Sequence, residues 1–269
     1  MAQMVWMDLK RMWRGRKLRR VILMELLLVV GYWVFSSRNI GHINADTWAK
    51  PLIQYYIVSD PFVFFGKLYS YLFPMLTAMP FATAYYDDMR SGYLGQLAIR
   101  YTTKSVLIAR YIAVSLSGML AATIGPVISL LLQAAIYPAV NPSPMSALSG
   151  ISDNNFLSGL YYEHAALYIL IMTLIGALIG GLMACISMVF GLFVKGQNQI
   201  LFLPMLFYMF WHVLCTRYYA GYLSPLSMLD VGQGFALRGD AIAWFLIVGN
   251  IVAFSLFVIV AGRRDILKG

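Results

Sequence analysis

The sequence predicts an all-α integral membrane protein in which six transmembrane helices follow an N-terminal amphipathic helix at the membrane interface. Of its 269 residues, 61% are hydrophobic and only 12% are charged, whereas soluble domains are about half apolar and about a quarter charged. The apolar residues gather in blocks near the length of about 20 residues that a helix needs to cross the hydrocarbon core. These blocks follow one another too closely to leave room for a separate globular domain.

Residues 1–20 are the first predicted element, a basic amphipathic helix in the plane of the lipid headgroups. One helical face is apolar and the other carries Asp8 and basic side chains, as in helices that lie on membranes. The side chains predicted to serve this surface are Trp6, Leu9, Lys10, Arg11, Trp13 and Arg14. A plain topology signal would also explain the positive charge, and the two interpretations are compatible.

Six apolar blocks make up the predicted transmembrane domain, residues 21–269. They cover residues 21–36, 68–86, 106–137, 165–194, 200–215 and 241–261. The third block is too long for one straight crossing, and Arg110 indicates that its first turn extends into the cytoplasm. In the fourth block, Gly176, Gly180 and Ala184 recur at a spacing that lets helices pack closely, most simply within the chain.

The basic residues predict the orientation of these spans. With the N-terminus inside, the cytoplasmic segments hold 15 of the 20 Lys and Arg residues, and the outer segments hold 5. This bias is the one that the positive-inside rule describes. The sequence therefore predicts a multi-pass plasma-membrane protein, of bacterial type, with both termini in the cytoplasm.

Glu25 is the one carboxylate inside a predicted span. Ionisable side chains at membrane depth are costly and suggest function by default. Because Glu25 lies about one turn from the cytoplasmic end of its block, we expect an ion pair with Arg20 or Arg90. A role in binding substrate or carrying a proton is the alternative.

The segment between the fifth and sixth blocks, residues 216–240, is about half apolar but broken by Pro225, Gly232 and Gly234. It cannot span the membrane. It is expected either to dip into the outer leaflet, with its backbone covered by protein, or to form a surface loop with an apolar anchor.

The segment between the second and third blocks carries the pattern that points to a family. Asp87 and Asp88 end the span, Gly92 follows after four residues, and leucines then precede a basic and hydroxyl cluster at residues 100–104. Together with the amphipathic N-terminal helix, the six spans and the long outer segment before the last span, this pattern resembles the permease subunits of ABC-2 type transporters, exporters of type V-like architecture. Tyr101 departs from the proline that family members often carry before a Ser-Arg pair.

The resemblance implies that a short helix in this segment docks on a separate ATPase subunit. Carried onto this sequence, the docking residues are Arg90, Gly92, Tyr93, Leu94, Gln96, Arg100, Thr103 and Lys104. The resemblance also implies a permease dimer, ATP and magnesium bound by the partner chain, and a peptide, antibiotic or lipid-like cargo. The alternative for this segment is an ordinary solvated loop that obeys the charge rule.

Several classes of protein find no support in the sequence. There is no GxxxxGK[ST] loop for ATP. Cys185, Cys215 and the three histidines lack metal-ligand spacing, and no catalytic set is apparent, so neither an enzyme nor a resident cofactor or metal is expected. The net charge of +9 follows from the cytoplasmic loops, so no nucleic-acid partner is expected. A stand-alone membrane carrier or an immunity protein without an ATPase partner is the alternative function.

Overall fold

The computed structural model describes residues 2–38, 52–58, 64–137, 141–142, 151, 155–194, 196–233 and 235–263. Within these residues the chain is all-helical and contains no strand, as expected. The elements are α1 (Ala2–Arg14), α2 (Arg16–Arg38), η2 (Leu52–Tyr55), α3 (Phe64–Ala78), α4 (Ala84–Arg90), α5 (Tyr93–Arg100), α6 (Thr103–Ala134), α7 (Ser158–Glu163), α8 (Ala165–Phe190), α9 (Gln197–Arg217), η3 (Gly221–Leu223), α10 (Pro225–Leu229) and α11 (Gly239–Arg263).

Four helices of the described chain, namely α6, α8, α9 and α11, are long and apolar enough to cross a membrane. The predicted blocks 106–137, 165–194, 200–215 and 241–261 correspond to them within a few residues. These four helices indicate a membrane protein. Block 21–36 lies inside the 23-residue helix α2, which is about 35 Å long at 1.5 Å per residue.

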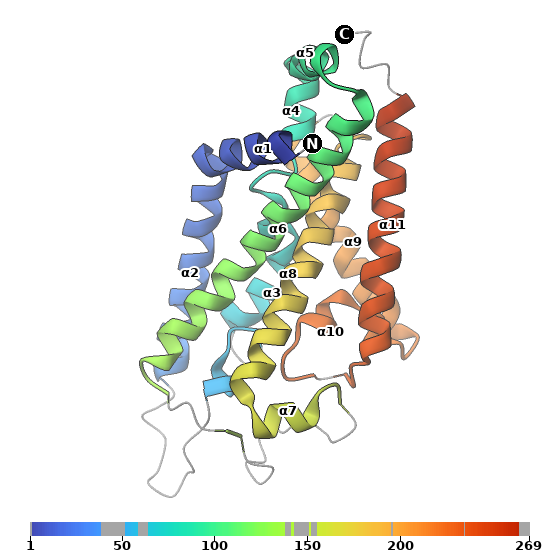
Figure 1. Ribbon diagram of the computed structural model, residues 1–269. Coiled ribbons are helices and arrows are strands. Elements are labelled where there is room, and N and C mark those ends of the chain that lie inside the picture. The colour runs from blue at the N-terminus through green and yellow to red at the C-terminus, as the bar shows by residue number, and fades with distance from the viewer. Residues whose placement is uncertain are drawn as a thin grey trace, which may run out of the picture.

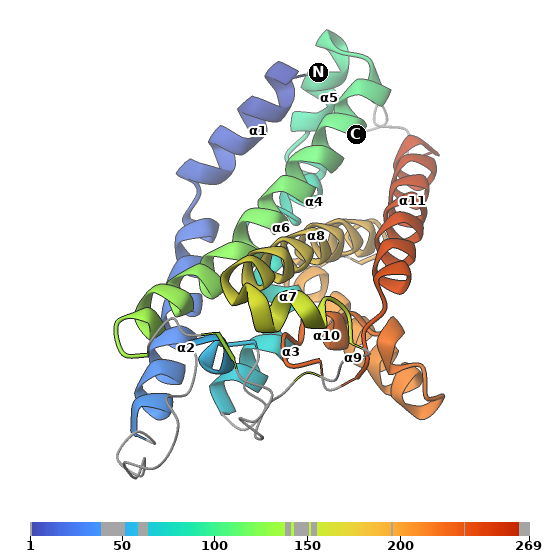
Figure 2. The ribbon, with the colours of Figure 1, turned by 60° about the horizontal axis from the view of Figure 1, so that its bottom comes forward.

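The bundle has two distinct ends. In Figure 1, α6 and α8 lie side by side in the middle, with α2 on one flank and α11 on the other. Helices α1, α4 and α5 and the C-terminal end of α11 lie at one end, which we call the α5 end. Helices α7 and α10 lie at the opposite end, where both contact α8 (Figure 2).

The prediction of one continuous helix over residues 68–86 is wrong. Helix α3 ends at Ala78, a turn covers residues 79–83, and α4 begins at Ala84. The reason is Pro80, which has no N–H to donate and whose ring opposes a straight continuation. The turn keeps its backbone hydrogen-bonded: the N–H of Ala82 donates to the carbonyl of Ala78 at 3.0 Å, and that of Ala84 to Phe81 at 2.9 Å.

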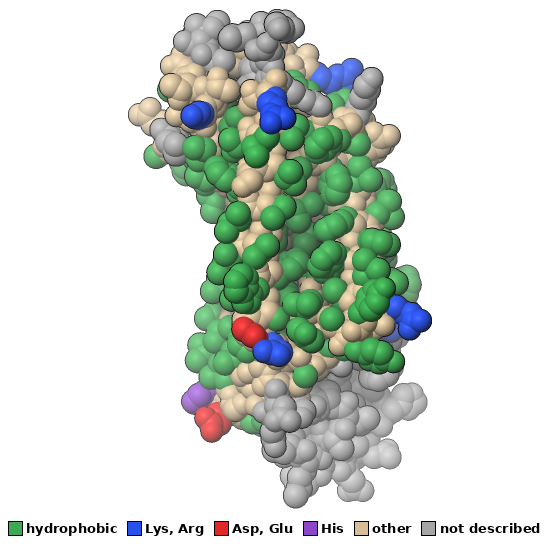
Figure 3. Space-filling model, turned by 90° about the vertical axis from the view of Figure 1, so that its right-hand side faces the viewer, with side chains coloured by type: hydrophobic (Ala, Val, Ile, Leu, Met, Phe, Trp, Pro, Cys, Tyr) green, Lys and Arg blue, Asp and Glu red, His purple; other side chains and the backbone are tan. Residues whose placement is uncertain are grey.

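Hydrophobic side chains cover the outside of the bundle between its two ends. On the face over α11, Figure 3 shows an apolar belt with charged side chains above and below it. Large exposed side chains of α11 include Trp244, Ile247, Ile251, Leu256 and Ile259. An apolar surface that extends along whole helices is typical of contact with lipid, and soluble monomers rarely expose one of this extent.

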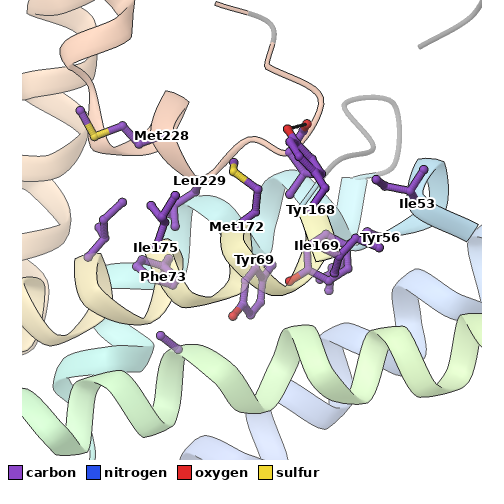
Figure 4. Close-up of a cluster of buried hydrophobic side chains, with 14 of the residues drawn as sticks. Ile53, Tyr56, Tyr69, Phe73, Tyr168, Ile169, Met172, Ile175, Met228 and Leu229 are labelled. Carbon is purple, nitrogen blue, oxygen red and sulfur yellow. Dashed lines mark hydrogen bonds between the residues drawn. The ribbon is translucent and has the colours of Figure 1, made fainter. Parts of the chain in front are cut away.

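Between α9 and α11, residues 221–233 fold back against the bundle. Met228 and Leu229 of α10 are buried beside Met172 and Ile175 of α8, as Figure 4 shows. Backbone groups here have partners: the N–H of Met228 donates to the carbonyl of Ser224 at 3.0 Å. Residues 221–233, none of which is exposed, are therefore covered by protein, which is the condition for a chain without a continuous helix at membrane depth.

Small residues allow α6 and α8 to approach closely. A Cβ atom on Gly118 of α6 would lie 2.6 Å from both the Cβ of Ala184 and the carbonyl oxygen of Gly180. A Cβ on Gly180 would lie 2.5 Å from the Cβ of Ala122. The small residues of the fourth block therefore pack within the chain.

We predict that Gly118→Ala lowers the stability of the bundle by about 1–3 kcal/mol, because the added methyl group forces the two helices apart. Thermal unfolding of the purified protein in mild detergent measures the effect. Gly262→Ala, in α11, is the control, since no atom lies within 4 Å of its added Cβ. Equal stability of the two variants would contradict the close packing.

Candidate functional site

A buried cluster of charges joins three helices at the α5 end. Arg110 of α6 is 1% exposed, and its Nη2 lies 2.5 Å from Oδ2 of Asp88 in α4. Its Nη1 lies 3.2 Å from Oδ1 of Asp8 in α1. Arg11 completes the cluster with a bidentate contact to Asp88, at 2.6 and 2.8 Å. Two guanidinium groups thus neutralise two carboxylates, which is the condition for burying charge at acceptable cost.

Apolar contacts enclose this charge cluster. The guanidinium of Arg110 lies 5.3 Å from the ring centroid of Phe81 in the turn after α3. Met4 and Met12, one turn before and after Asp8 on α1, are buried in the same core. Helix α1 therefore presents a stripe of Met, Asp and Met to the bundle, held by both packing and charge.

The position of Asp8 differs from the expectation that it lies on the solvated face of α1. It is 6% exposed. Burial raises its pKa, Arg110 acts in the opposite direction, and the neighbouring Asp88 raises the pKa further. The hydrogen bond to Asp88 raises the pKa of Arg11. The cluster therefore favours the charged form of Arg11, whereas the raised pKa of Asp8 means that this carboxyl protonates more readily than usual.

A second, more exposed polar group lies beside the first. Nζ of Lys17 in α2 contacts Oγ1 of Thr83 at 2.5 Å and Oδ2 of Asp87 at 2.8 Å. Nε2 of Gln197, at the start of α9, donates to the other oxygen of Asp87 at 2.5 Å. Adjacent carboxylates of α4 thus contact α2 and α9 through Asp87, and α1 and α6 through Asp88.

Helix α5 is anchored by one face and exposed on the other. Gly92 precedes it with a φ of 71°, a left-handed conformation that suits glycine and turns the chain from α4 into α5. Leu94 and Leu97 are buried against the bundle, at 3% and 9% exposure. Gln96 and Arg100 are exposed. The result is a short helix fixed on the outside of the bundle end with a polar face outward.

The predicted docking residues differ in how exposed their side chains are. Six of the eight are exposed at the α5 end: Arg90, Gly92, Gln96, Arg100, Thr103 and Lys104. Tyr93 is half-buried, with the Arg11 guanidinium 5.4 Å from its ring centroid. Leu94 lies in the core, so its predicted contact with a partner is not available at the surface; its position follows from the phase of α5.

A shallow cleft of about 470 Å³ adjoins this exposed surface. It is lined by Tyr86, Asp87, Arg90, Ser91, Gly196 and Gln197. The Arg90 guanidinium donates to the Tyr86 hydroxyl at 3.0 Å. The cleft lies between α4 and the start of α9, so a segment bound there would contact two helices that are far apart in the sequence.

The predicted membrane-surface residues lie mostly on the outside of α1. Trp6 and Trp13 are 69% and 65% exposed, on the side opposite the buried stripe. Lys10 and Arg14 are also exposed, whereas Leu9 is half-buried. Arg11 is the exception, since it pairs with Asp88 and belongs to the charge cluster.

Glu25 does not form the expected ion pair. It is fully buried in α2, and within the described part of the chain it forms no ion pair and no side-chain hydrogen bond; the polar group that approaches it is the backbone of Gly125. Gly125 of α6 and Tyr69 of α3 are its neighbours. The helix begins at Arg16, so Glu25 lies nine residues inside it, about 13 Å from its start. This depth places it beyond the reach of Arg90, which contacts Tyr86 instead.

An apolar groove of about 540 Å³ opens between α6 and α8 in the half of the bundle near α7. Its walls are formed mainly by Val127, Leu130, Ile169, Leu170 and Leu174. Thr123, Thr173 and Asn141 add a few polar atoms. Such a lining suits a largely apolar molecule with one or two hydrogen-bonding groups.

The sequence did not reveal the pairing of Asp8, Asp88 and Arg110. One signal was present: Arg110 stands inside an apolar stretch, and a buried arginine requires an acidic partner. The described residues contain no group of three or more His, Cys, Asp or Glu that is arranged to hold a metal ion.

Comparisons with protein-family models, curated proteins and solved structures found no match for this chain.

We predict that Arg110→Met lowers the stability of the protein by about 3 kcal/mol or more, because it leaves buried carboxylates without their counter-charge. Asp88→Leu combined with Arg110→Met is expected to recover part of this loss, since Arg11 is half-exposed and tolerates solvation. Thermal unfolding in detergent distinguishes the variants. A double variant no more stable than Arg110→Met alone would contradict the charge-pair explanation.

Proposed function

We propose that the chain is the transmembrane permease subunit of an ATP-driven exporter of ABC-2 type, which works with a separate ATPase subunit. It would cross the plasma membrane six times, with α2 as the first span and the broken pair α3 and α4 as the second. Support comes from the alternation of these elements between the two ends of the bundle (Figure 1). The α5 end carries the basic segments and would face the cytoplasm.

In this proposal α1 lies along the inner leaflet. Its exposed tryptophans, Trp6 and Trp13, suit the headgroup region, where amphipathic aromatic rings concentrate. Lys10 and Arg14 on the same exposed side would meet anionic lipid. The buried stripe of Met4, Asp8 and Met12 means that α1 would also be a fixed part of the bundle.

The observation that carries the proposal is the way in which α5 is attached to the bundle. A helix of eight residues projects from the bundle end with its polar face outward, yet Leu94 and Leu97 fix it to the core. A surface that must transmit force needs this combination of accessibility and rigid attachment. The exposed residues Arg90, Gln96 and Arg100 and the neighbouring cleft would receive the ATPase, which would bind ATP and magnesium.

The charge cluster would carry the motion into the spans. A push on α5 reaches α4 across Gly92, and α4 is held to α6 by the contact between Asp88 and Arg110. The second and third spans would therefore tilt together, with α1 following through Asp8. Tightly packed elements move in this way as rigid bodies.

The cargo class follows from the lining of the groove between α6 and α8. Its apolar walls with isolated threonines favour an amphipathic or hydrophobic molecule, such as a peptide, antibiotic or lipid. A second permease copy would pair with this chain and enclose the transport path.

We predict that the tagged full-length chain, purified in mild detergent from its native membrane, recovers a P-loop ATPase that labels with photoreactive ATP. The double substitution Gln96→Glu and Arg100→Glu is expected to reduce recovery by about tenfold or more, because charge reversal within an interface is strongly unfavourable. Neither side chain is buried, so the fold is retained.

The matched control is Arg19→Glu with Gln199→Glu, which makes the same charge change at exposed positions of α2 and α9. Recovery of the ATPase is expected to be unchanged in this variant. Equal recovery with both double variants would exclude α5 as the docking element, and a chain that transports alone would refute the proposal.

Glu25 favours a second candidate function, a stand-alone proton-coupled carrier. Carboxyl groups at membrane depth form part of proton relays in pumps and transporters, and Glu25 is fully buried and forms no ion pair among the described residues. An ion-coupled carrier generally needs several such groups, and among the described spans Glu25 is the one buried carboxyl group without an ion-pair partner, since the buried Asp88 of α4 is paired with arginines.

We expect no proton flux in liposomes that contain the purified chain alone and an entrapped pH-sensitive dye. We also expect Glu25→Gln to retain full stability, because the substitution replaces an ionisable carboxyl with a neutral amide of the same shape and breaks no ion pair. Glu163→Gln, at an exposed position in α7, is the control. A proton flux that Glu25→Gln abolishes and Glu163→Gln leaves intact would favour the carrier over the permease.

A further inference from the structure

A basic cavity lies in the elbow between α1 and α2. Its volume is about 320 Å³, and the turn after α3 forms its opposite wall. Four cationic side chains line it: Arg11, Arg16, Lys17 and Arg20. One carboxylate, that of Asp87, also lines it. The cavity therefore carries a clear excess of positive charge.

The excess resides in two of the four side chains. Arg11 is paired with Asp88, and Lys17 is paired with Asp87. Arg16 and Arg20 are exposed and form no ion pair with any other residue that the structure describes. Two guanidinium groups at the rim of one cavity can hold a phosphate group through several charge-assisted hydrogen bonds.

The backbone adds to this preference for an anion. Gly15 interrupts the helix between α1 and α2, and it lines the cavity together with the first residues of α2. The N–H groups at the start of a helix have no partner within the helix, and the helix dipole places partial positive charge there.

The surface next to the cavity identifies the kind of phosphate. Leu23, Leu27 and Val30 continue the line of Arg16 and Arg20 along one face of α2, since each lies three or four residues from the next. These three side chains are 64%, 68% and 41% exposed. A cationic head above an exposed apolar stripe matches an amphiphile with a phosphate head and a hydrocarbon tail.

We infer that this elbow is a binding site for an anionic glycerophospholipid, whose phosphate is held by Arg16 and Arg20 and whose acyl chain lies along Leu23, Leu27 and Val30. The bound lipid would join α1 to α2 and to the turn after α3, so it would brace the bend at Gly15. The inference depends on the placement of this end at the membrane surface and not on an ATPase partner.

The test uses the full-length chain in nanodiscs of phosphatidylcholine that contain increasing fractions of phosphatidylglycerol. Native mass spectrometry counts the retained phosphatidylglycerol, and its apparent dissociation constant is measured. Arg16→Gln with Arg20→Gln is expected to weaken retention by roughly tenfold or more, since each basic contact to anionic lipid contributes substantially. Lys67→Gln with Arg217→Gln, the same charge change on exposed positions near the start of α3 and at the end of α9, outside the cavity, is expected to change it by less than about twofold.

Further arms distinguish the source of the phosphate. Leu23→Ser with Leu27→Ser is expected to weaken retention of phosphatidylglycerol while leaving the melting temperature in pure phosphatidylcholine unchanged. Inorganic phosphate and glycerol 3-phosphate are expected not to displace the lipid. Displacement by either soluble anion would overturn the lipid assignment in favour of a free phosphate site. Equal losses in the cavity variant and the variant at Lys67 and Arg217 would also overturn it, because they would indicate general attraction of anionic lipid to exposed basic side chains.

Discussion

The guanidinium of Arg110 is buried within an apolar bundle, and this single constraint organises the α5 end of the molecule. A charge removed from water requires opposite charge at close range, and here the partners come from two other helices. Asp88 fixes the end of α4 against α6, and Asp8 fixes α1 on the same spot. Neither helix can slide or rotate by one residue without leaving a buried charge unpaired.

The break that Pro80 causes is compatible with this constraint. A continuous helix through residues 68–86 would fix the direction of the carboxylates that follow it. With the turn, α4 takes a direction of its own and presents Asp87 and Asp88 to different neighbours. The turn also exposes the Thr83 hydroxyl to Lys17. Since the turn residues keep their backbone hydrogen bonds, the interruption is compatible with a position at the edge of a membrane.

Hydropathy and small-residue spacing predicted what depends on local sequence. The helices α6, α8, α9 and α11 follow from long apolar blocks, and the close packing at Gly180 follows from its spacing with Gly176 and Ala184. The features that the sequence did not predict depend on contacts between distant segments or on helix phase. The pairing of Asp8 with Arg110 joins residues about 100 positions apart in the sequence. The break at Pro80 lies inside an otherwise uniform apolar block. The inward direction of Leu94 depends on the rotation of a two-turn helix that no periodicity can fix.

The basic residues of the α5 end therefore serve two distinct purposes that a count of charges cannot separate. Arg110, Arg11 and Lys17 form ion pairs with carboxylates of α4, and these ion pairs hold helices together. Among the exposed cations that have no carboxylate partner within the described residues, two pairs differ in their surroundings: Arg16 and Arg20 at the elbow, and Arg90 and Arg100 around α5. The first pair adjoins an exposed apolar stripe, which suits lipid. The second adjoins a polar helix and a shallow cleft, which suits protein. The local surroundings of each free cation, more than the total charge, thus distinguish the two surfaces.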